Sequence, residues 1–196
     1  MSEPSPGTPG AHEHERRYGS PAERLRAPER VSLMEVPRVV DLSLEAFHGT
    51  TVLDVGTGTA VFAEAFAGRG LRVTGIDPNE ELLSVARTFV PDGQFQVGTA
   101  EELPFEDGSF DLLVMAHVLH ETDDPLLALR EAFRVARLRV IVLEWPYRDE
   151  DRGPPLAHRL PAARIEELAR RAGFAGIEKI DLTRMVLYRL TSKAPM

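Results

Sequence analysis

The 196-residue sequence contains no cysteine, and aromatic residues make up only 7% of the chain. Without cysteine it can form no disulfide, no cysteine-ligated zinc or iron–sulfur site and no thiol nucleophile. No apolar run approaches the roughly 18 residues of a membrane-spanning helix. The first residues also lack the apolar core of a signal peptide, so we expect a soluble, cytoplasmic protein.

Basic residues are missing from one internal stretch. Between Arg87 and Arg130 there is no Lys or Arg, although nine acids occur there, and the whole chain has 31 acids, 23 bases and a net charge of −8. Net acidity argues against binding to nucleic acid, whose affinity for proteins comes mainly from Lys and Arg. The base-free stretch accounts for the whole charge imbalance.

Strand-like and helix-like segments alternate along the chain and predict a doubly wound α/β domain. Short apolar runs predict strands at 51–55, 71–76, 94–97, 110–115, 140–144, 177–181 and 186–190. Helical patterns lie between most of the first six predicted strands, so these strands should be mostly parallel. The last two are joined by only a few residues and must be antiparallel. We expect one seven-stranded sheet that ends in an antiparallel hairpin.

The sequence before the first strand divides into two parts. Residues 1–20 are rich in Pro, Gly, Ser and charge, and we expect a disordered tail. Residues 21–48 have a helical pattern that Pro28 and Pro37 interrupt. This helical segment, together with Tyr18 before it, either closes over the site as a lid or stays weakly ordered. In the lid interpretation, Tyr18 is a candidate to face the substrate. Residues 49–196 form the main domain.

Two glycines follow the first predicted strand, in VLDVGTGTA at 52–60. Gly56 and Gly58 permit a tight turn and close approach of the backbone to a ligand at the start of the next helix. The dinucleotide pattern G-x-G-x-x-G requires a third glycine at position 61, where Val61 stands instead. This departure counts against NAD as the ligand.

An acidic residue ends the second predicted strand, in Ile76-Asp77-Pro78. A carboxylate at this position can accept hydrogen bonds from both hydroxyls of a ribose. Asp77 could also be an ordinary strand-end turn residue. Its spacing of 19 residues from Gly58 favours the ribose interpretation.

Together with GTAEELPFEDGSFDLLVMAHVLHE at 98–121, these motifs resemble the class I S-adenosylmethionine-dependent methyltransferases. The sequence is most similar to the ubiquinone/menaquinone-biosynthesis-like branch, methyltransferase type 11. The resemblance covers about residues 42–190 and includes DVGTGT, GIDPNEELL, AEELPFEDGSFD, VLHE and LEWPYRDEDRGPPLAHRL. It implies a Rossmann-like sheet, S-adenosyl-L-methionine as cofactor, and methyl transfer to a small-molecule acceptor by in-line displacement.

The resemblance also implies which residues bind the cofactor. Asp77 corresponds to the ribose-binding acid, and Asp54 organises the glycine turn near the methionine moiety. Thr99 stands where an Asp is common, and Ala60 replaces the usual third glycine. The implied cofactor-binding set is Asp54, Gly56, Thr57, Gly58, Asp77, Pro78, Thr99, Ala100, Glu101 and Ala116. Because the resemblance places segments of the base-free stretch against the cofactor and the acceptor, we expect its acids to form a rim around the site, which suits a cationic sulfonium and disfavours polyanionic acceptors.

The acceptor side is predicted from residues after the fourth and fifth strands. His117 and His120 are candidates for a general base or an acceptor contact, because histidine titrates near neutrality, although both could be structural. His-x-x-His-Glu is not followed by a third ligand at a recognisable spacing, so we expect no metal. Trp145 and Tyr147 follow the fifth strand and either stack on a substrate or pack in the core.

Two other functions stay open. An S-adenosylmethionine-binding protein without turnover would have the same motifs, since methyl transfer has no obligatory catalytic residue. An NAD-dependent oxidoreductase shares the glycine turn and the ribose acid, but the sequence lacks the third glycine and a Tyr-x-x-x-Lys pair. The sequence does not indicate the acceptor atom, whether oxygen, nitrogen or carbon, or the oligomeric state.

Overall fold

The computed structural model describes residues 22–192, so Tyr18 and the predicted tail at 1–20 lie outside the described residues. The strands are β1 (Thr51–Val55), β2 (Arg72–Asp77), β3 (Gln94–Val97), β4 (Phe110–Ala116), β5 (Ala136–Glu144), β6 (Gly176–Asp181) and β7 (Val186–Thr191). They form one sheet in the order β3-β2-β1-β4-β5-β7-β6. Strands β1 to β5 pair in parallel, and β7 pairs antiparallel with β5 and β6. The predicted sheet, mostly parallel with a final antiparallel hairpin, is confirmed.

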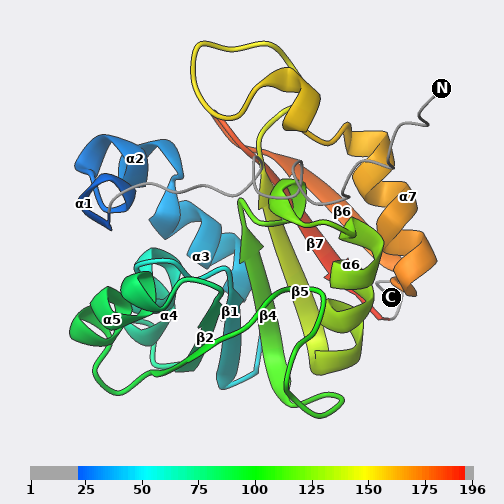
Figure 1. Cartoon of the computed structure of the whole chain (residues 1–196). Coiled ribbons are helices and arrows are strands. Elements are labelled where there is room, and N and C mark those ends of the chain that lie inside the picture. The colour runs from blue at the N-terminus through cyan, green and yellow to red at the C-terminus, as the bar shows by residue number, and fades with distance from the viewer. Residues whose placement is uncertain (1–21, 193–196) are drawn as a thin grey trace, which may run out of the picture.

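Helices cover both faces of this sheet (Figure 1). They are α1 (Ala22–Leu25), α2 (Pro28–Leu33), α3 (Val36–Leu44), α4 (Val61–Ala67), α5 (Glu80–Phe89), α6 (Pro125–Val135) and α7 (Ala162–Ala172). Helices α3, α4 and α5 share one apolar cluster with alternate residues of the strands, such as Val52 and Leu112. Helices α6 and α7 pack with Leu53 and Leu113 on the other face. Neighbouring strand residues point to opposite faces, which explains why the central strands are apolar throughout.

Side-chain caps and a terminal glycine set the ends of several helices. The side chain of Asn79 accepts hydrogen bonds from the first turn of α5, and that of Asp124 does so for α6. Pro125 occupies the first turn of α6, where its missing N–H is not needed. Gly173 follows α7 with a φ of 114°, a left-handed conformation that glycine adopts at little cost. Each of these ends agrees with the sequence pattern.

Strand β5 is longer than predicted. It begins at Ala136, directly after the last residue of α6, whereas the apolar run predicts a start at 140. Residues 137–139, which precede the predicted strand, are therefore part of β5. No glycine follows α6, and its C-cap Ala136 is already extended, with ψ of 130°. The chain thus passes from helix to strand without a turn.

None of the helices in residues 22–192 is both long enough and apolar enough to cross a membrane. The carboxyl ends of the five parallel strands lie at one edge of the sheet. The chain leaves this edge after β5 in a long loop, yellow at the top of Figure 1, while α1 and α2 lie to one side at the same level. The site is built between these segments.

Candidate active site

Two loops at the carboxyl edge of the sheet are joined by one carboxylate. Gly56 follows β1 in the left-handed region, with φ of +66°, and its N–H donates to the carbonyl of Ile76 at 2.8 Å. The Oδ2 atom of Asp77 accepts from the backbone N–H of Gly58 at 2.9 Å, and its Oδ1 atom accepts from that of Asn79 at 2.9 Å. Burial raises the pKa of Asp77. The carboxylate thereby fixes the glycine turn relative to the end of β2.

A second acid lies beneath the glycine turn. Asp54 is buried in β1, and its Oδ2 atom accepts a hydrogen bond from Oγ1 of Thr57 at 2.7 Å. Burial raises the pKa of Asp54 to about 7. Ala60, in place of the third glycine, has a φ of +65°, a conformation that costs a residue with a Cβ atom about 1–2 kcal/mol. The turn therefore keeps its shape without that glycine.

A cavity of about 660 Å³ opens above these loops. Eight of the ten predicted cofactor-binding residues line it, whereas Asp54 and Thr57 do not, because their side chains bond to each other below the turn. The eight are Gly56, Gly58, Asp77, Pro78, Thr99, Ala100, Glu101 and Ala116. The lining carries five acidic side chains and one arginine. We call this space the cofactor cavity.

A second cavity, of about 810 Å³, adjoins the first. Helix α2, the residues after β4, and the loop after β5 enclose it, and we call it the acceptor cavity. Trp145 lines this cavity, is almost completely buried and also belongs to the apolar cluster of α3 and α4. Tyr147 does not line it, and its side chain is exposed. Of the two predicted aromatic residues, the structure brings only Trp145 to the site.

Three residues line both cavities, and they are Arg30, His117 and Glu121. Arg30 comes from α2, whereas the other two follow β4. A ligand in one cavity would therefore lie next to a ligand in the other. Drug-sized ligands commonly occupy pockets of about 300–1,000 Å³, so both spaces are large enough for a small molecule.

His120 is held by a glutamate that the sequence motifs do not single out. It lies in the short helix η1 (Leu119–Glu121), and its ring Nδ1 is 2.7 Å from Oε2 of Glu144. The backbone N–H of His120 donates to the other oxygen of Glu144 at 3.2 Å. Burial alone would lower the pKa of His120, but the Glu144 carboxylate raises it above the ordinary value. The sequence signal that could have identified Glu144 was its position directly after the apolar run at 140–143.

His117 is buried at the junction of the cavities. Its φ of +62° is unusual for a residue other than glycine. Neither ring nitrogen has a hydrogen-bond partner among residues 22–192, and the ring centroid lies 5.3 Å from that of Trp145. Burial, with the nearby His120 and Arg30 charges, holds the pKa of His117 well below its usual range. The imidazole is therefore neutral.

Residues 146–155, the 146–155 loop, fold around the buried side chain of Arg159. The guanidinium donates to four backbone carbonyls of this loop at 2.6 to 3.1 Å. These carbonyls belong to Pro146, Arg148, Arg152 and Pro154. The sequence gives no signal for this arrangement, because the contacts join irregular segments. Arg159 thereby shapes one wall of the acceptor cavity.

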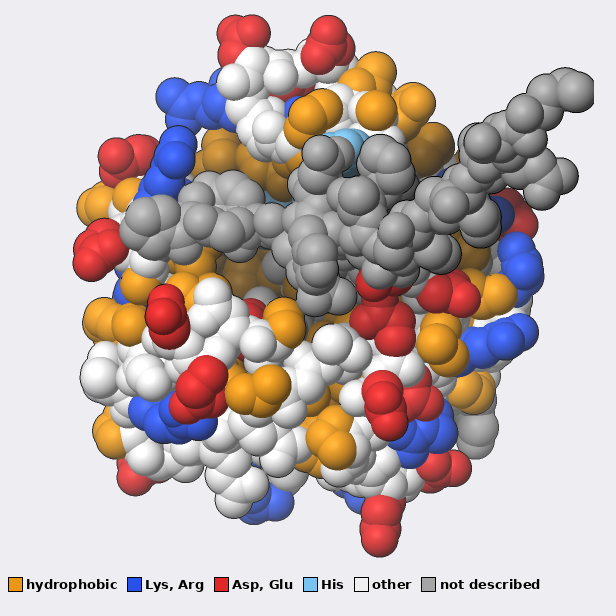
Figure 2. All heavy atoms as spheres, viewed as in Figure 1, with side chains coloured by type: hydrophobic (Ala, Val, Ile, Leu, Met, Phe, Trp, Pro, Cys, Tyr) orange, Lys and Arg blue, Asp and Glu red, His pale blue; other side chains and the backbone are white. Residues whose placement is uncertain are grey.

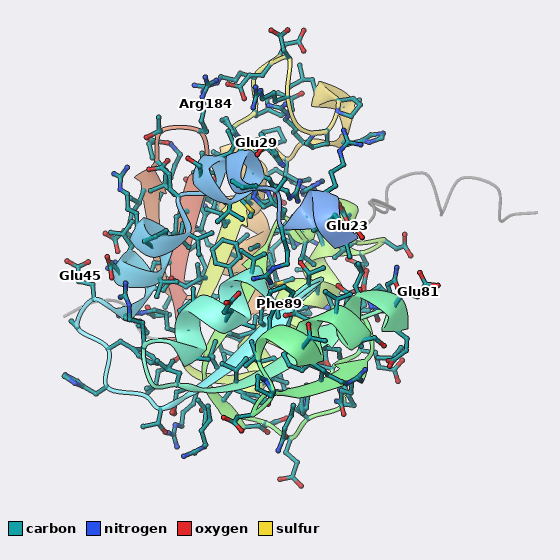
Figure 3. The ribbon with its side chains drawn as sticks, turned by 90° about the vertical axis from the view of Figure 1, so that its left-hand side faces the viewer. Glu23, Glu29, Glu45, Glu81, Phe89 and Arg184 are labelled. Atoms are coloured by element: carbon teal, nitrogen blue, oxygen red, sulfur yellow. The ribbon has the colours of Figure 1, made fainter. Side chains whose placement is uncertain are left out.

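The N-terminal helices are attached beside the glycine turn through Arg26. Its Nη1 atom donates to the carbonyl of Thr59 at 2.6 Å, and its other nitrogen pairs with Glu64 of α4. The guanidinium carbon lies 3.4 Å above the ring centroid of Phe89, on α5. Figure 3 shows Phe89 between the N-terminal helices above and α4 and α5 below. The neighbouring Leu25 lines the cofactor cavity.

The expected acidic rim is only partly present. Of the nine acids in the base-free stretch, Glu101 and Glu121 line the cofactor cavity. Asp111 instead lies at the start of β4, at the opposite edge of the sheet, and pairs with Arg137. The acceptor cavity is lined by three arginines and three acids, so it is not an acidic space. Acidic and basic side chains both occur around the face shown in Figure 2. The expected rim is therefore present for Glu101 and Glu121 only, because other acids of the stretch, such as Asp111, lie elsewhere in the fold.

Within residues 22–192, no group of three His, Asp or Glu side chains is arranged to hold a metal ion.

The strand order, the glycine turn and Asp77 together define the class of protein. It is a doubly wound domain of the kind that binds a ribose-containing cofactor at the carboxyl edge of its sheet. Residues 53–142 match the model of a family described as a methyltransferase domain. This part of the chain is therefore similar to methyltransferase domains, a class whose cofactor is S-adenosylmethionine, as the motifs implied.

Individual relatives agree with this class. The chain is similar to an uncharacterized methyltransferase of Mycobacterium tuberculosis, with 38% identity over 118 residues, 60% of this chain and 48% of the relative. It is also similar to the demethylmenaquinone methyltransferase of Thermotoga maritima, with 38% identity over 111 residues, 55% and 48% of the two chains. The chain thus spans about half the length of the curated relatives it matches. A crystal structure of a SAM-dependent methyltransferase from Aquifex aeolicus shares the fold, with a TM-score of 0.74, 24% identity, and coverage of 88% and 97%.

Proposed function

We propose that this protein binds S-adenosylmethionine in the cofactor cavity and transfers its methyl group to a small molecule in the acceptor cavity. The observation that carries the proposal is that the two cavities meet at Arg30, His117 and Glu121. Direct displacement requires the nucleophile, the methyl carbon and the sulfur to lie in line, and two adjoining cavities allow this. Such positioning can contribute about 7–11 kcal/mol to a rate acceleration.

The residues of the cofactor cavity suit S-adenosylmethionine chemically. Asp77 has two further lone pairs on its carboxylate beyond those that hold Gly58 and Asn79, and these can accept the ribose hydroxyls. The segment 99–101 is assigned to the adenine edge, and the backbone of Ala116, at the end of β4, to the methionine ammonium. The excess of acidic side chains favours a ligand with two cationic groups. When bound, the cofactor supplies a methyl group on a cationic sulfonium.

Two of the predicted cofactor residues act indirectly in this proposal. Asp54 and Thr57 bond to each other beneath the glycine turn, so they set the shape of the turn and do not line the cavity. The α1–α3 segment covers one side of the site, with Leu25 in the cofactor cavity and Leu33 in the acceptor cavity. This agrees with its proposed role as a lid.

The acceptor is proposed to be a small molecule with an apolar body. Leu33, Trp145, Pro154 and Pro155 give the acceptor cavity an apolar wall. Opposite charges balance in the rest of the lining, so neither a polyanion nor a polycation is favoured. We propose a small-molecule acceptor in the cytoplasm, as expected from the sequence, and not a nucleic acid.

The experiment that tests the cofactor is a thermal-shift titration of the full chain with S-adenosylhomocysteine and, separately, with NADH. A ligand at 100 times its Kd stabilises the folded state by about 2.7 kcal/mol. We expect stabilisation by S-adenosylhomocysteine and none by NADH, and the reverse result would establish the oxidoreductase alternative. Methyl transfer is then measured by mass spectrometry. Cofactor binding without any methylated product would show a binding protein that has no turnover.

A further inference from the structure

The His120–Glu144 pair is oriented for proton transfer into the acceptor cavity. An ionised carboxylate can only accept hydrogen bonds, so the 2.7 Å contact places a proton on Nδ1 of His120. In the neutral ring the other nitrogen, Nε2, then has a lone pair that can accept a proton, and it lies 3.7 Å from Oε1 of Glu121, which lines both cavities. The backbone N–H of His120 bonds to the second oxygen of Glu144, so the carboxylate holds the residue at two points. His120 lines the acceptor cavity.

His117 also lines the acceptor cavity, but it differs from His120 in its hydrogen-bond partners. It has no carboxylate partner, and both of its ring nitrogens lack partners among the described residues. A buried polar group without a partner is unfavourable, so a ligand that offers a hydrogen bond at the junction of the cavities is favoured there. A neutral ring at this point also avoids placing a positive charge beside a sulfonium. His117 is suited to orient a polar group of the acceptor, whereas His120 is suited to receive a proton.

Resting on the proposed function, we propose that the acceptor is methylated on an oxygen or nitrogen atom that carries a proton, and that His120 removes this proton. In the step, the acceptor atom forms its bond to the methyl carbon as the carbon–sulfur bond breaks and leaves its electron pair on the sulfur. The acceptor's proton passes to Nε2 of His120. Glu144 stabilises the resulting imidazolium and is a positioning residue, and the proton is later released to solvent.

A buried imidazole–carboxylate pair is of most use for acceptors of this kind. A hydroxyl group loses its proton with difficulty at neutral pH, and a general base in the transition state typically contributes 10²–10⁴-fold to the rate. A thiol, with an ordinary pKa near 8.5, ionises readily without such a pair. The two cavities alone leave the acceptor atom open. The His120–Glu144 contact favours an O–H or N–H acceptor, because there the proton is on the attacking atom itself and can pass to the base as the bond to the methyl carbon forms, whereas a carbon acceptor attacks through its π electrons and loses its proton afterwards.

Turnover should depend on pH through His120, because only its neutral form can accept a proton. Four charged or titratable groups act on it, and they are Glu144 at the end of β5, Glu121 beside it in η1, Arg159 and His117. Glu144 raises the pKa of His120, so kcat should rise with pH through a value above that of an ordinary histidine. Removal of the Glu144 charge should move this rise to lower pH.

The acceptor atom is identified first, with the full chain, S-adenosylmethionine carrying a deuterated methyl group, and a small-molecule extract of the source organism. We expect the label on oxygen or nitrogen, as shown by the fragmentation of the labelled product. A label on carbon or sulfur would overturn this inference and leave the proposed function intact. Bound cofactor with no labelled product at all would overturn both.

The base is tested with His120→Gln, using His48→Gln, an exposed histidine before β1, as the matched control. His120→Gln should lower kcat with the identified acceptor by about 10²–10⁴-fold. The Kd of S-adenosylhomocysteine should not change in either variant. Unchanged turnover in His120→Gln would show that His120 is structural.

Glu144 is tested with Glu144→Gln, using Glu166→Gln on the surface of α7 as the control. The amide can still bond to His120 but lacks the charge, so the rise of kcat should move to lower pH by about 1–3 pH units. NMR titration of the histidine rings gives a readout that needs no acceptor. There the pKa of His120 should fall in Glu144→Gln and stay unchanged in the control. A pKa of His120 that does not respond to Glu144→Gln would overturn the positioning role.

Discussion

The two cavities are built from different kinds of structure. The cofactor cavity rests on the ends of adjacent parallel strands, where the backbone N–H groups of Gly56 and Gly58 donate to the Ile76 carbonyl and the Asp77 carboxylate. The acceptor cavity joins α2, η1, Trp145 and the 146–155 loop, which lie far apart in the sequence and meet through side chains. The comparison shows why a cofactor can be inferred from local motifs, whereas an acceptor requires the assembled structure. It also predicts that the cavities can be disturbed separately.

The largest effect is expected from Arg159→Ala, which removes the side chain that holds the 146–155 loop. Hydrogen bonds to charged groups contribute about 1.5–3 kcal/mol each, so the free energy of unfolding should fall by at least the value of one such bond. Amide hydrogen exchange should increase within the 146–155 loop, and the KM for the acceptor should rise. The control is Arg164→Ala, which removes an exposed ion pair of α7. A matching loss of affinity for S-adenosylhomocysteine would contradict the separation of the two cavities.

Asp77→Ala should have the complementary effect. Loss of the carboxylate leaves the amides of Gly58 and Asn79 and the ribose hydroxyls without an acceptor, at a cost of about 1–3 kcal/mol in cofactor affinity. Calorimetry with S-adenosylhomocysteine measures this loss, and hydrogen exchange in the 146–155 loop should not change. Asp181→Ala, at the end of the edge strand β6, is the matched control. An unchanged Kd in Asp77→Ala would refute the ribose assignment.

The smallest effect is expected from Arg26→Ala, which loosens the N-terminal segment over the glycine turn. Its contacts with Glu64 and Phe89 are partly exposed, and a cation–π contact of this kind contributes about 0.5–1 kcal/mol, or about two- to fivefold in affinity. The dissociation rate of S-adenosylhomocysteine, followed by stopped flow, should increase by this factor. Arg69→Ala, which removes an exposed ion pair with Asp41, should leave the rate unchanged. Equal rates in both variants would rule out a lid role for Arg26.

Most of the sheet could be predicted from the sequence because apolar runs, caps and connection lengths are local signals. The glycine turn and Asp77 were found for the same reason, since strand ends place them at one edge. Glu144 was missed because an acid after a strand has no distinctive pattern until its partner His120 is nearby in space. Arg159 was missed because its partners are backbone carbonyls of an irregular loop. The acidic rim was overestimated because a charge count along the chain does not reveal ion pairs such as Asp111–Arg137.

The central claim is that a cofactor and an acceptor meet at His117. NMR of the full chain with ¹³C-labelled histidine rings, titrated with S-adenosylhomocysteine, tests it most directly. His117 lines both cavities, whereas His158 lines only the acceptor cavity. Binding should therefore shift the His117 resonance strongly and leave that of His158 nearly unchanged. Saturation with S-adenosylhomocysteine that shifts His158 and not His117 would contradict the account.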